Sequence, residues 1–516
     1  MAQGVLSYQY EEDSSDSGMT AWAGLPLFLD LAQAAGLWDA ISGHVHVRAR
    51  RHSGWSDAQT VMSLVLLNLV GGVAVSDIRL LEGDRGLGEV LYRAEATRLN
   101  RQDRRALKKR RRKQRKQGKR VTNFPSQSAI FRYLAAFHDP KQEAMREHAE
   151  KAFIPKANDD LWGLHQVNAD FVAFVQAHAS HQRATIDMDA TLVQTDKRDA
   201  LFCYKGFKAY QPLNAYWAEQ DLIIRSEFRD GNVPAGYQQL RVFKESLDAL
   251  PKGVEQVFHR SDSAGYQIEL LKYCAEGHNE RFGVIEFAIS ADVTDAFKQA
   301  VAEVPAAQWH PVYRSYDDGM RVKLDQQWAE VCYVPNWAGY SKRGPTYRFV
   351  AIREPLRQLE IPGTEPQSEL PFPTIAYSQH ERYKLFGIVT NRDIPGDELI
   401  GWHRQRCGKS EEAHAIMKQD LAGGQLPSND FGENAAWWAI MILAFNLSSA
   451  IRRLVLGSGW AKKRMKAIRF AIINLPGRVV RHARKLVIRL THNHPHNAIL
   501  FAARARILSL AQGPSG

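Results

Sequence analysis

Residues 186–191, Ile-Asp-Met-Asp-Ala-Thr, alternate apolar and polar side chains in the pattern typical of a β-strand. Side chains two positions apart on a strand point to the same face, so Asp187, Asp189 and Thr191 are expected to lie together. Acids within an apolar strand are costly unless they are paired, hydrogen-bonded or bound to a hard cation such as Mg²⁺. A sheet face open to water would produce the same pattern. This strand therefore predicts either a metal site or a solvated face.

The segments that follow predict a mixed α/β sheet. Strand patterns cover 210–216, 222–228, 254–258 and 282–289, and helical patterns cover 237–250 and 264–274. Strands first, followed by strands that alternate with helices, indicate a sheet of this kind. Further strand-like pieces at 328–334 and 347–352, with Pro and Gly between them, predict an inserted β-rich subdomain.

A second acid, Asp262, follows the strand predicted at 254–258, in the run His259-Arg260-Ser261-Asp262. Catalytic groups gather at the carboxyl ends of strands in α/β sheets. An Asp at this place is also a common turn or helix-cap residue. Asp262 alone therefore does not decide between a catalytic and a structural role.

A third segment, 402–418, carries Glu411 and Lys418 seven residues apart, which places them on one face of a helix. Arg404 would join this face if the helix continued through Gly408, although Gly in mid-helix makes the continuation uncertain. A charged helical face is also what a solvent-exposed helix presents.

Taken together, the three segments resemble the DDE transposases of bacterial insertion sequences, in the group whose third acid lies in a Tyr-Arg-Glu-Lys signature. The resemblance covers most of residues 55–510. The matching pieces are Asp189-Ala190-Thr191, Arg260-Ser261-Asp262-Ser263, the run from Arg406 to Lys418, Asp420-Leu421-Ala422-Gly423-Gly424 and Asn434-Ala435-Ala436-Trp437-Trp438.

The resemblance implies an RNase H-like catalytic core with a β-rich insertion before its third carboxylate. It implies Asp189, Asp262 and Glu411 as catalytic ligands of Mg²⁺, for which Mn²⁺ is an expected substitute. Such a site cleaves phosphodiester bonds at the ends of a DNA element and joins the freed 3′-hydroxyl to target DNA. Lys418 and Arg406 are implied contacts to DNA phosphate.

The sequence departs from the signature in two ways. Trp402 or His403 stands in the tyrosine region, and four residues instead of three separate Arg406 from Glu411. Glu412 is the alternative third acid, but only Glu411 leaves the signature's six residues before Lys418. Asp187 is the alternative first acid, and Thr191 favours Asp189 because the group carries a small hydroxyl residue after that acid.

A basic run supplies the net charge of +12: residues 101–120 hold thirteen Lys or Arg against a single acid, Asp103. Concentrated positive charge attracts DNA phosphate and releases counterions on binding. A solvated charge run is the plain alternative, and neither a lipidation motif nor an adjoining apolar helix supports binding to a membrane surface. The nominated DNA contacts are Lys108, Lys109, Arg110, Arg111, Arg112 and Lys113.

The cysteines, the amino terminus and the apolar stretches predict a protein of the bacterial cytoplasm, associated with the nucleoid. The four cysteines lie far apart, which argues against a disulfide framework or a zinc pattern. The amino terminus lacks the basic and apolar regions of a signal peptide. The apolar stretch 435–447 is too short to span a bilayer and predicts a buried helix. Pro495 within the cluster His492, His494 and His496 indicates a loop and not a zinc site.

The expected organisation is a disordered segment 1–20, a helical DNA-binding region 21–175, a core in two parts at 176–299 and 385–456, a β-rich insertion 300–384, and a basic region 457–516. A helix-turn-helix after the basic run and plain three-helix packing are equally open. Trp309, Trp328 and Trp337 are candidates for stacking on a displaced base, although core packing is the commoner role.

The expected partners are the double-stranded DNA of the element ends and the target DNA, which a homo-oligomer is expected to bind. No membrane is expected among the partners. A DNA-binding protein of transposase ancestry that no longer transposes, and a metal-dependent nuclease that does not join DNA, are the alternative functions.

Overall fold

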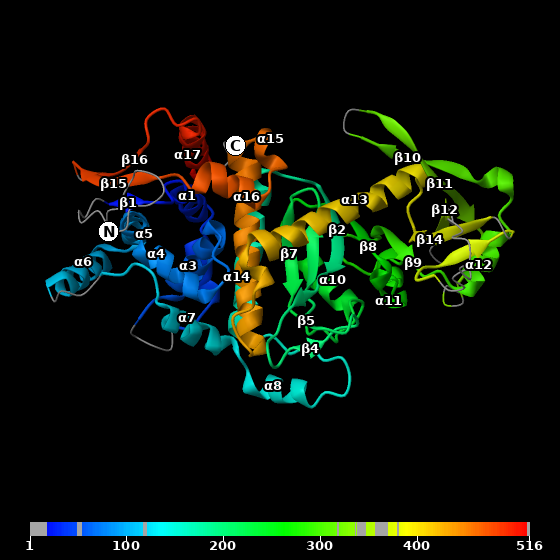
Figure 1. The fold of residues 1–516 in the computed structure, drawn as a ribbon, viewed down its shortest axis with the longest axis horizontal. Coiled ribbons are helices and arrows are strands. Elements are labelled where there is room, and N and C mark those ends of the chain that lie inside the picture. The colour runs from blue at the N-terminus through cyan, green and yellow to red at the C-terminus, as the bar shows by residue number, and fades with distance from the viewer. Residues whose placement is uncertain are drawn as a thin grey trace, which may run out of the picture.

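The computed structural model describes residues 18–48, 54–116, 121–316, 319–335, 337, 347–356, 370–378, 381–483 and 485–512. A ten-stranded mixed sheet forms its centre, in the order β10-β11-β12-β14-β9-β8-β2-β6-β7 with β13 paired to β14. Figure 1 shows this sheet beside a body of helices built from both ends of the chain. The sheet positions the predicted acids.

Five strands form the half of the sheet around the acids: β2 (Arg183–Ala190), β6 (Leu213–Trp217), β7 (Leu222–Glu227), β8 (Gln256–Ser261) and β9 (Glu286–Ala291). β2, β6 and β7 form an antiparallel meander, whereas β8 and β9 run parallel to β2. Parallel neighbours need crossover connections, and α10 (Gln239–Asp248) and α11 (Ile268–Ala275) provide them. The carboxyl ends of β2 and β8 therefore meet at one edge.

The β-rich segment continues this sheet instead of forming a sheet of its own. Its strands are β10 (His310–Ser315), β11 (Arg321–Val331), β12 (Arg348–Pro355), β13 (Thr374–Ala376) and β14 (Arg382–Thr390). β14 pairs antiparallel with β9, and β12, β11 and β10 follow in turn. Periodicity alone did not indicate this pairing, because register between distant strands is set by contacts across the sheet.

Helix α13 (Gly396–Ala415) follows β14, crosses the sheet (Figure 1) and passes through Gly408 without a break. It continues as a π-helical turn, Ile416–Asp420, which we call the π-turn. In an α-helix each N–H bonds the carbonyl four residues back, whereas in a π-helix the bond spans five, so the π-turn holds one extra residue. Glu411 and Lys418 lie on this helix and its π-turn.

Helix α14 (Phe431–Ala450) is buried along its whole length, as the apolar stretch 435–447 predicted. Asn446 fixes it to the sheet, because its amide exchanges hydrogen bonds with both backbone groups of Ile223 in β7. By length and composition the continuous helix Phe431–Leu456 is apolar enough to cross a membrane, but 83% of its most apolar window is buried inside the protein. The bent pair Asp57–Val70 and Val75–Gly83 meets the same criterion only as a single span.

The described part of the chain before β2 is helical apart from the short strand β1. Its longer helices are α1 (Pro26–Ala34), α2 (Leu37–His44), α3 (Asp57–Val70), α5 (Arg85–Arg98), α6 (Arg101–Lys116), α7 (Gln127–Leu134), α8 (Pro140–Glu147) and α9 (Asp159–His178). Ser56 caps α3 and forms a capping box with Gln59, which fixes the start of this helix. The basic run thus becomes a helix, α6, over Arg101–Lys116.

A small antiparallel sheet joins the two ends of the chain. β1 (Met19–Thr20) pairs with β15 (Gly477–His482), and β15 pairs with β16 (Lys485–Leu490). Helix α17 (Asn497–Ala511) then packs on α1. The remaining elements are α4 (Ile78–Gly83), α12 (Asp295–Ala302), α15 (Ser458–Ala461), α16 (Met465–Ile468) and the strands β3 (Val193–Gln194), β4 (Leu201–Phe202) and β5 (Lys208–Tyr210).

Candidate active site

Asp189 and Asp262 lie together at the edge where β2 and β8 end. Both line one cavity of about 540 Å³, whose wall includes the loop 231–235. Burial raises the pKa of Asp189 to about 6; the Arg406 guanidinium opposes this rise and the Asp262 carboxylate adds to it. Asp262 also accepts a hydrogen bond from the Ala264 N–H, 3.1 Å away. The two acids predicted from separate motifs therefore share one solvent-reachable pocket.

Asp187 is occupied elsewhere. Its carboxylate is fully buried and accepts hydrogen bonds from Nε and Nη2 of Arg260 at 2.6 and 2.7 Å. Arg260 in turn donates from Nη1 to the Trp402 carbonyl of α13. A carboxylate with both oxygens held in this way has a structural role, so the geometry favours Asp189 over Asp187 as the reactive acid.

Arg406, predicted as a contact to DNA phosphate, points inward from α13. Its side chain is 9% exposed, and Nη1 lies 3.2 Å from Oδ2 of Asp189. Its buried Nε has no hydrogen-bond partner. In this arrangement Arg406 neutralises Asp189 and is not turned toward solvent.

Lys418 also lies close to the end of β2. Its Nζ donates to the Leu192 carbonyl at 3.2 Å, and burial lowers the pKa of the amine while the Asp189 carboxylate raises it. The end of β2 therefore has a second cation beside it.

Glu411 does not join the acid pair. Both Glu411 and its alternative Glu412 are exposed on α13, whereas the neighbouring Ser410 is buried at 2% exposure. The residues that the structure describes contain no group of three or more His, Cys, Asp and Glu side chains placed to hold a metal ion. Two of the three predicted ligands are assembled and the third is not.

Asp189 and Asp262 nevertheless suit a hard divalent cation. Such a cation takes carboxylate oxygens as ligands, and Mg²⁺ is usually bound through one or two carboxylates together with substrate phosphates. The donor set fits the predicted Mg²⁺ or Mn²⁺ in type, and it is incomplete in number.

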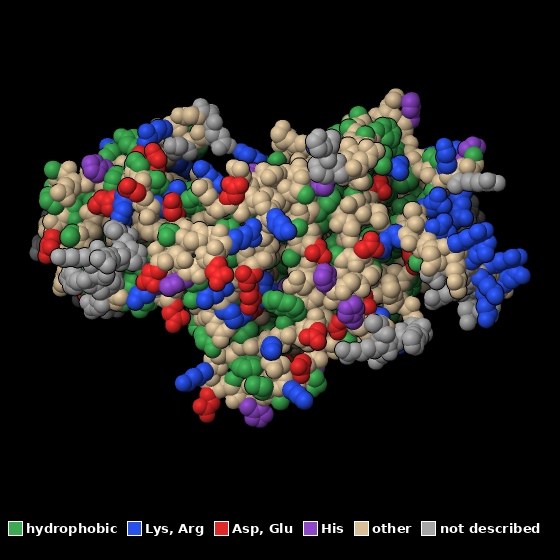
Figure 2. All heavy atoms as spheres, turned by 180° about the vertical axis from the view of Figure 1, so that it is seen from behind, with side chains coloured by type: hydrophobic (Ala, Val, Ile, Leu, Met, Phe, Trp, Pro, Cys, Tyr) green, Lys and Arg blue, Asp and Glu red, His purple; other side chains and the backbone are tan. Residues whose placement is uncertain are grey.

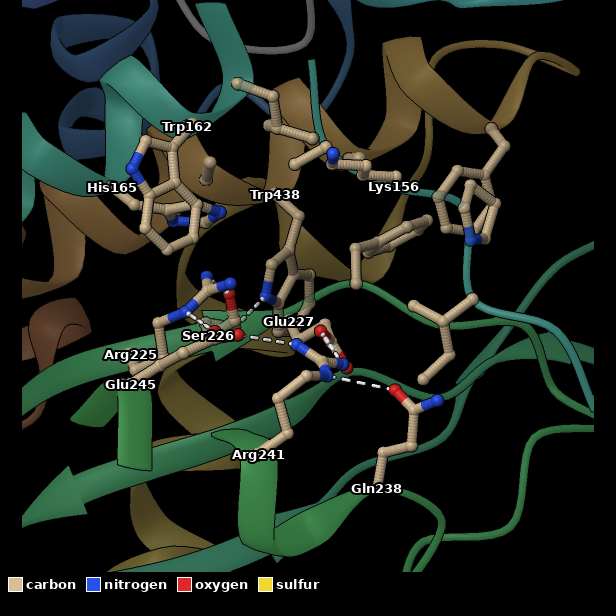
Figure 3. A pocket seen from close by; sticks show the side chains of 18 of the residues that line it. Lys156, Trp162, His165, Arg225, Ser226, Glu227, Gln238, Arg241, Glu245 and Trp438 are labelled. Atoms are coloured by element: carbon tan, nitrogen blue, oxygen red, sulfur yellow. Dashed lines mark hydrogen bonds and ion pairs between the residues drawn. The ribbon is translucent and has the colours of Figure 1, made fainter. Parts of the chain in front are cut away.

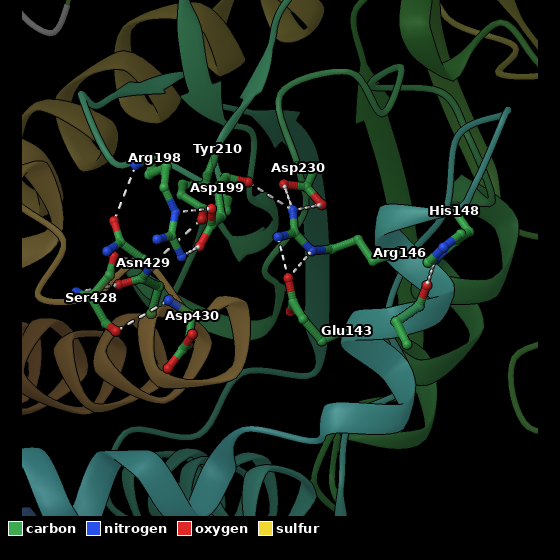
Figure 4. Close-up of polar contacts among 12 residues, drawn as sticks. Glu143, Arg146, His148, Arg198, Asp199, Tyr210, Asp230, Ser428, Asn429 and Asp430 are labelled. Carbon is green, nitrogen blue, oxygen red and sulfur yellow. Dashed lines mark hydrogen bonds and ion pairs between the residues drawn. The ribbon is translucent and has the colours of Figure 1, made fainter.

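Arg146, which no sequence motif singles out, holds two walls of the cavity in place. It donates to both oxygens of Asp230 at 3.0 and 3.2 Å, to the Asp199 carbonyl at 3.1 Å and to Glu143 of its own helix, α8 (Figure 4). Asp230 directly precedes the loop 231–235. Because these partners lie 53 and 84 residues from Arg146, no local pattern could have revealed them.

A second cavity, of about 530 Å³, lies between α9, β7, α10 and α14 (Figure 3). Its lining combines Trp162 and Trp438 with charged groups that satisfy one another: Arg225 with Glu245, and Arg241 with Glu227 and Glu245. The Trp438 indole donates to Ser226. The arginines and glutamates of this cavity are thus paired with one another.

The nominated basic residues lie on α6. Lys108, Lys109, Arg112 and Lys113 are exposed, and Figure 2 shows Lys and Arg side chains gathered at this end of the molecule. Arg111 instead packs over the Tyr92 ring and pairs with Glu89, which also pairs with Arg481 of β15. The side chain of Arg110 lies outside the described residues. Glu89 thus links the basic helix α6 to β15 of the basic carboxyl-terminal region.

The tryptophans nominated for base stacking pack within the protein. Trp309 is buried beneath Arg353, and Trp328 is partly buried beside His310. Trp337 contacts the rings of Tyr266 and Tyr347. The histidine cluster lies in the loop before α17, with His494 and His496 side by side.

Comparisons with known proteins identify the family of the chain. Among solved structures, the chain is similar to the piggyBac transposase in a cryo-EM synaptic complex with hairpin DNA, with 10% identity and a TM-score of 0.43 over 96% of this chain and 83% of that chain. No curated protein matches the sequence. Residues 13–512 match the family described as transposase DDE domain group 1. The chain therefore belongs to this family of transposases.

Proposed function

We propose that the protein is a DNA transposase of the bacterial insertion-sequence type, with an RNase H-like core that binds two divalent cations. The observation that carries this proposal is the meeting of Asp189 and Asp262 in one cavity at the ends of two parallel neighbouring strands. The strand order β7-β6-β2-β8-β9, with three antiparallel strands followed by two parallel ones, supports the RNase H-like assignment.

Each residue of the site has a distinct task in this proposal. Asp189, Asp262 and Glu411 would hold Mg²⁺, which when bound would activate the attacking oxygen of water or of a 3′-hydroxyl and stabilise the negative charge on the leaving oxygen. Arg406 balances the charge of Asp189 before the cation arrives. Lys418, beside β2, is placed to contact the phosphate next to the cut. The exposed cations of α6 bind the DNA of the element end away from the cut.

The test is excision and strand transfer of a marker flanked by the native element ends, with Mg²⁺ and with Mn²⁺. Asp189→Ala, Asp262→Ala and Glu411→Ala are expected to lose cleavage and joining while retaining DNA binding. Glu412→Ala, an exposed neighbour on the same helix, and Asp248→Ala, at the exposed end of α10, are the matched controls and should remain active. A Glu412→Ala variant that is inactive beside an active Glu411→Ala would move the third ligand to Glu412.

A second function is favoured by one observation. Since Glu411 lies apart from the acid pair, a DNA-binding protein of transposase ancestry would explain an incomplete site. Wild-type protein that binds element ends but neither cleaves nor joins them with either cation would establish that function instead. Cleavage without joining would indicate a nuclease.

A further inference from the structure

We propose that α13 has two registers, and that movement of its π-turn toward the amino terminus, to the helix around Gly408, shifts the residues that it passes by one position and so carries Glu411 into the position that Ser410 holds. This inference rests on the proposed function, because it supplies the missing third carboxylate of the same site. Its evidence lies in the local geometry of the helix.

Ser410 lies on the face of α13 that is turned toward Asp189. Arg406, four residues earlier, reaches Asp189, and His414, four residues later, lies with Nε2 3.4 Å from the amide of Asn214. Asn214 is the direct cross-strand neighbour of Asp189. Residues spaced by four share one helical face, so position 410 lies between these two contacts and faces Asp189.

Two buried polar atoms on this face lack partners in the register observed. They are the hydroxyl of Ser410 and the Nε of Arg406. Buried polar groups without hydrogen bonds cost free energy, so the observed register is strained at the position where a ligand is expected. A glutamate four residues after Arg406 would accept a hydrogen bond from its guanidinium.

The π-turn provides the residue needed for a shift. As a π-turn moves toward the amino terminus, each residue that it passes takes over the position of the residue before it. If the π-turn moves from Ile416–Asp420 to the helix around Gly408, Glu411 rotates by about 100° and takes the position of Ser410. Glu411 then lies as far along the helix from Arg406 as Ser410 does in the observed register.

The part of the segment that carries Glu411 holds little apolar surface. Between Glu411 and Ala415 the only buried apolar side chain is Ala413, and the large buried side chains that would repack, Ile416 and Met417, lie in the π-turn itself. A side chain at Gly408 would meet no atom within 4 Å, so the glycine is not required for packing. Gly in a helix interior costs about 1 kcal/mol relative to Ala, which makes this the point where an irregular turn forms most easily.

Charge explains why the shift depends on a cation. With Glu411 inward, three carboxylates would lie together beside only two cationic side chains, Arg406 and Lys418, and this arrangement is unfavourable until a divalent cation joins them. The outward register therefore belongs to the cation-free protein and the inward register to the cation-bound one.

Two single-residue deletions in the full chain test this directly. Deletion of Gly408 and deletion of Gln419, which is exposed in the π-turn, each remove the extra residue and leave the same regular helix between the same ends. They differ in the residue four positions after Arg406, which is Glu411 in the first variant and Ser410 in the second. Mn²⁺ affinity is measured by the electron paramagnetic resonance signal of free Mn²⁺.

We expect the Gly408 deletion to bind Mn²⁺ at least tenfold more tightly than the Gln419 deletion, and Glu411→Gln in the former to remove the gain. Equal affinities, or no effect of Glu411→Gln, would overturn the proposal. If wild type and the Gln419 deletion cleave DNA equally well, the register shift fails and the proposed function stands. If the Gly408 deletion shows the Mn²⁺ gain and no protein cleaves DNA, the shift stands and the proposed function fails.

Thiol labelling covers the case in which a deletion variant does not fold. Ser410→Cys is made with Cys332→Ser and Cys407→Ser, which removes both exposed native thiols. Because Ser410 is buried in the observed register, Mn²⁺ should accelerate labelling at least tenfold as the residue leaves this position, and Glu411→Gln should abolish the acceleration. Labelling that Mn²⁺ leaves unchanged would contradict the shift.

Discussion

Arg260 donates two hydrogen bonds to Asp187 in a pair that is almost completely buried, and Asp187 lies only two residues along β2 from Asp189, the proposed reactive acid. Two acids with the same orientation on one strand therefore have different tasks. One holds β2 to β8 and to α13, and the other faces the cavity.

Replacement of these two acids should separate stability from activity. Asp187→Ala leaves Arg260 as a buried unpaired charge, and the free energy of unfolding is expected to fall by about 3–5 kcal/mol. Asp189→Ala should lower it by less, because the loss of the Asp189–Arg406 pair is partly offset by removal of the burial cost that raises the pKa of Asp189. Urea unfolding measures both. The double variant Asp187→Leu, Arg260→Met should recover much of the loss, and a double variant as unstable as Asp187→Ala would contradict the assignment.

The hydrogen bonds of Arg146 should keep the loop 231–235, which forms one wall of the cavity, in a fixed conformation. Arg146→Leu removes the partner of the buried Asp230, so we expect a loss of about 3–5 kcal/mol and faster hydrogen exchange in the loop 231–235. Arg198→Ala removes an exposed pair with Asp199 and is the matched control, with no measurable loss of stability. Unchanged exchange in 231–235 after Arg146→Leu would show that the loop is held by other contacts.

Acid should destabilise the fold through His259. Burial lowers the pKa of this imidazole from 6.5 to about 3. As the pH falls below about 6.5, His259 takes up a proton in the unfolded chain but stays neutral in the folded chain. Its contribution to the free energy of unfolding is therefore complete above about pH 6.5 and is lost progressively between this pH and about pH 3. His259→Gln should make the decline shallower by about 1.4 kcal/mol per pH unit between pH 6 and 4.5. His278→Gln, at an exposed histidine, should leave the slope unchanged when unfolding is followed against pH.

DNA binding by α6 should be visible in its salt dependence. Changing Lys108, Lys109, Arg112 and Lys113 to Gln should reduce the slope of log Kd against log salt by about 0.9 for each phosphate that α6 no longer neutralises. The control changes four exposed lysines elsewhere, Lys141, Lys151, Lys244 and Lys252. Fluorescence anisotropy with element-end DNA between about 50 and 200 mM salt gives both values. Equal slopes for the two sets would exclude α6 as the main DNA-binding element.

Local sequence patterns were sufficient for the elements around the acids. Alternation in β2 and the helical spacing of α10 are consequences of neighbouring residues, and both were predicted from them. The pairing of Asp187 with Arg260 joins residues 73 apart, so the sequence left Asp187 and Asp189 as alternatives.

The helix that carries Glu411 shows a second feature that the sequence did not predict, the place where a helix accommodates an extra residue. The sequence showed one residue too many between Arg406 and Glu411, and Gly408 made a break in the helix a reasonable expectation. The structure keeps the helix intact and places the extra residue in the π-turn instead. Where a helix absorbs an insertion depends on which side chains the sheet beneath it accepts, and a linear pattern does not contain this information.

The pairing of Thr20 with Gly477 also affects how the protein is made. A ribosome adds about 5–20 residues each second, so roughly 20–90 s separate the synthesis of these two residues. During this time the helices that carry the basic run emerge without the strand that completes their small sheet. A nascent chain released early would therefore present the basic helix on an unfinished scaffold, and only a chain translated through β15 can close it.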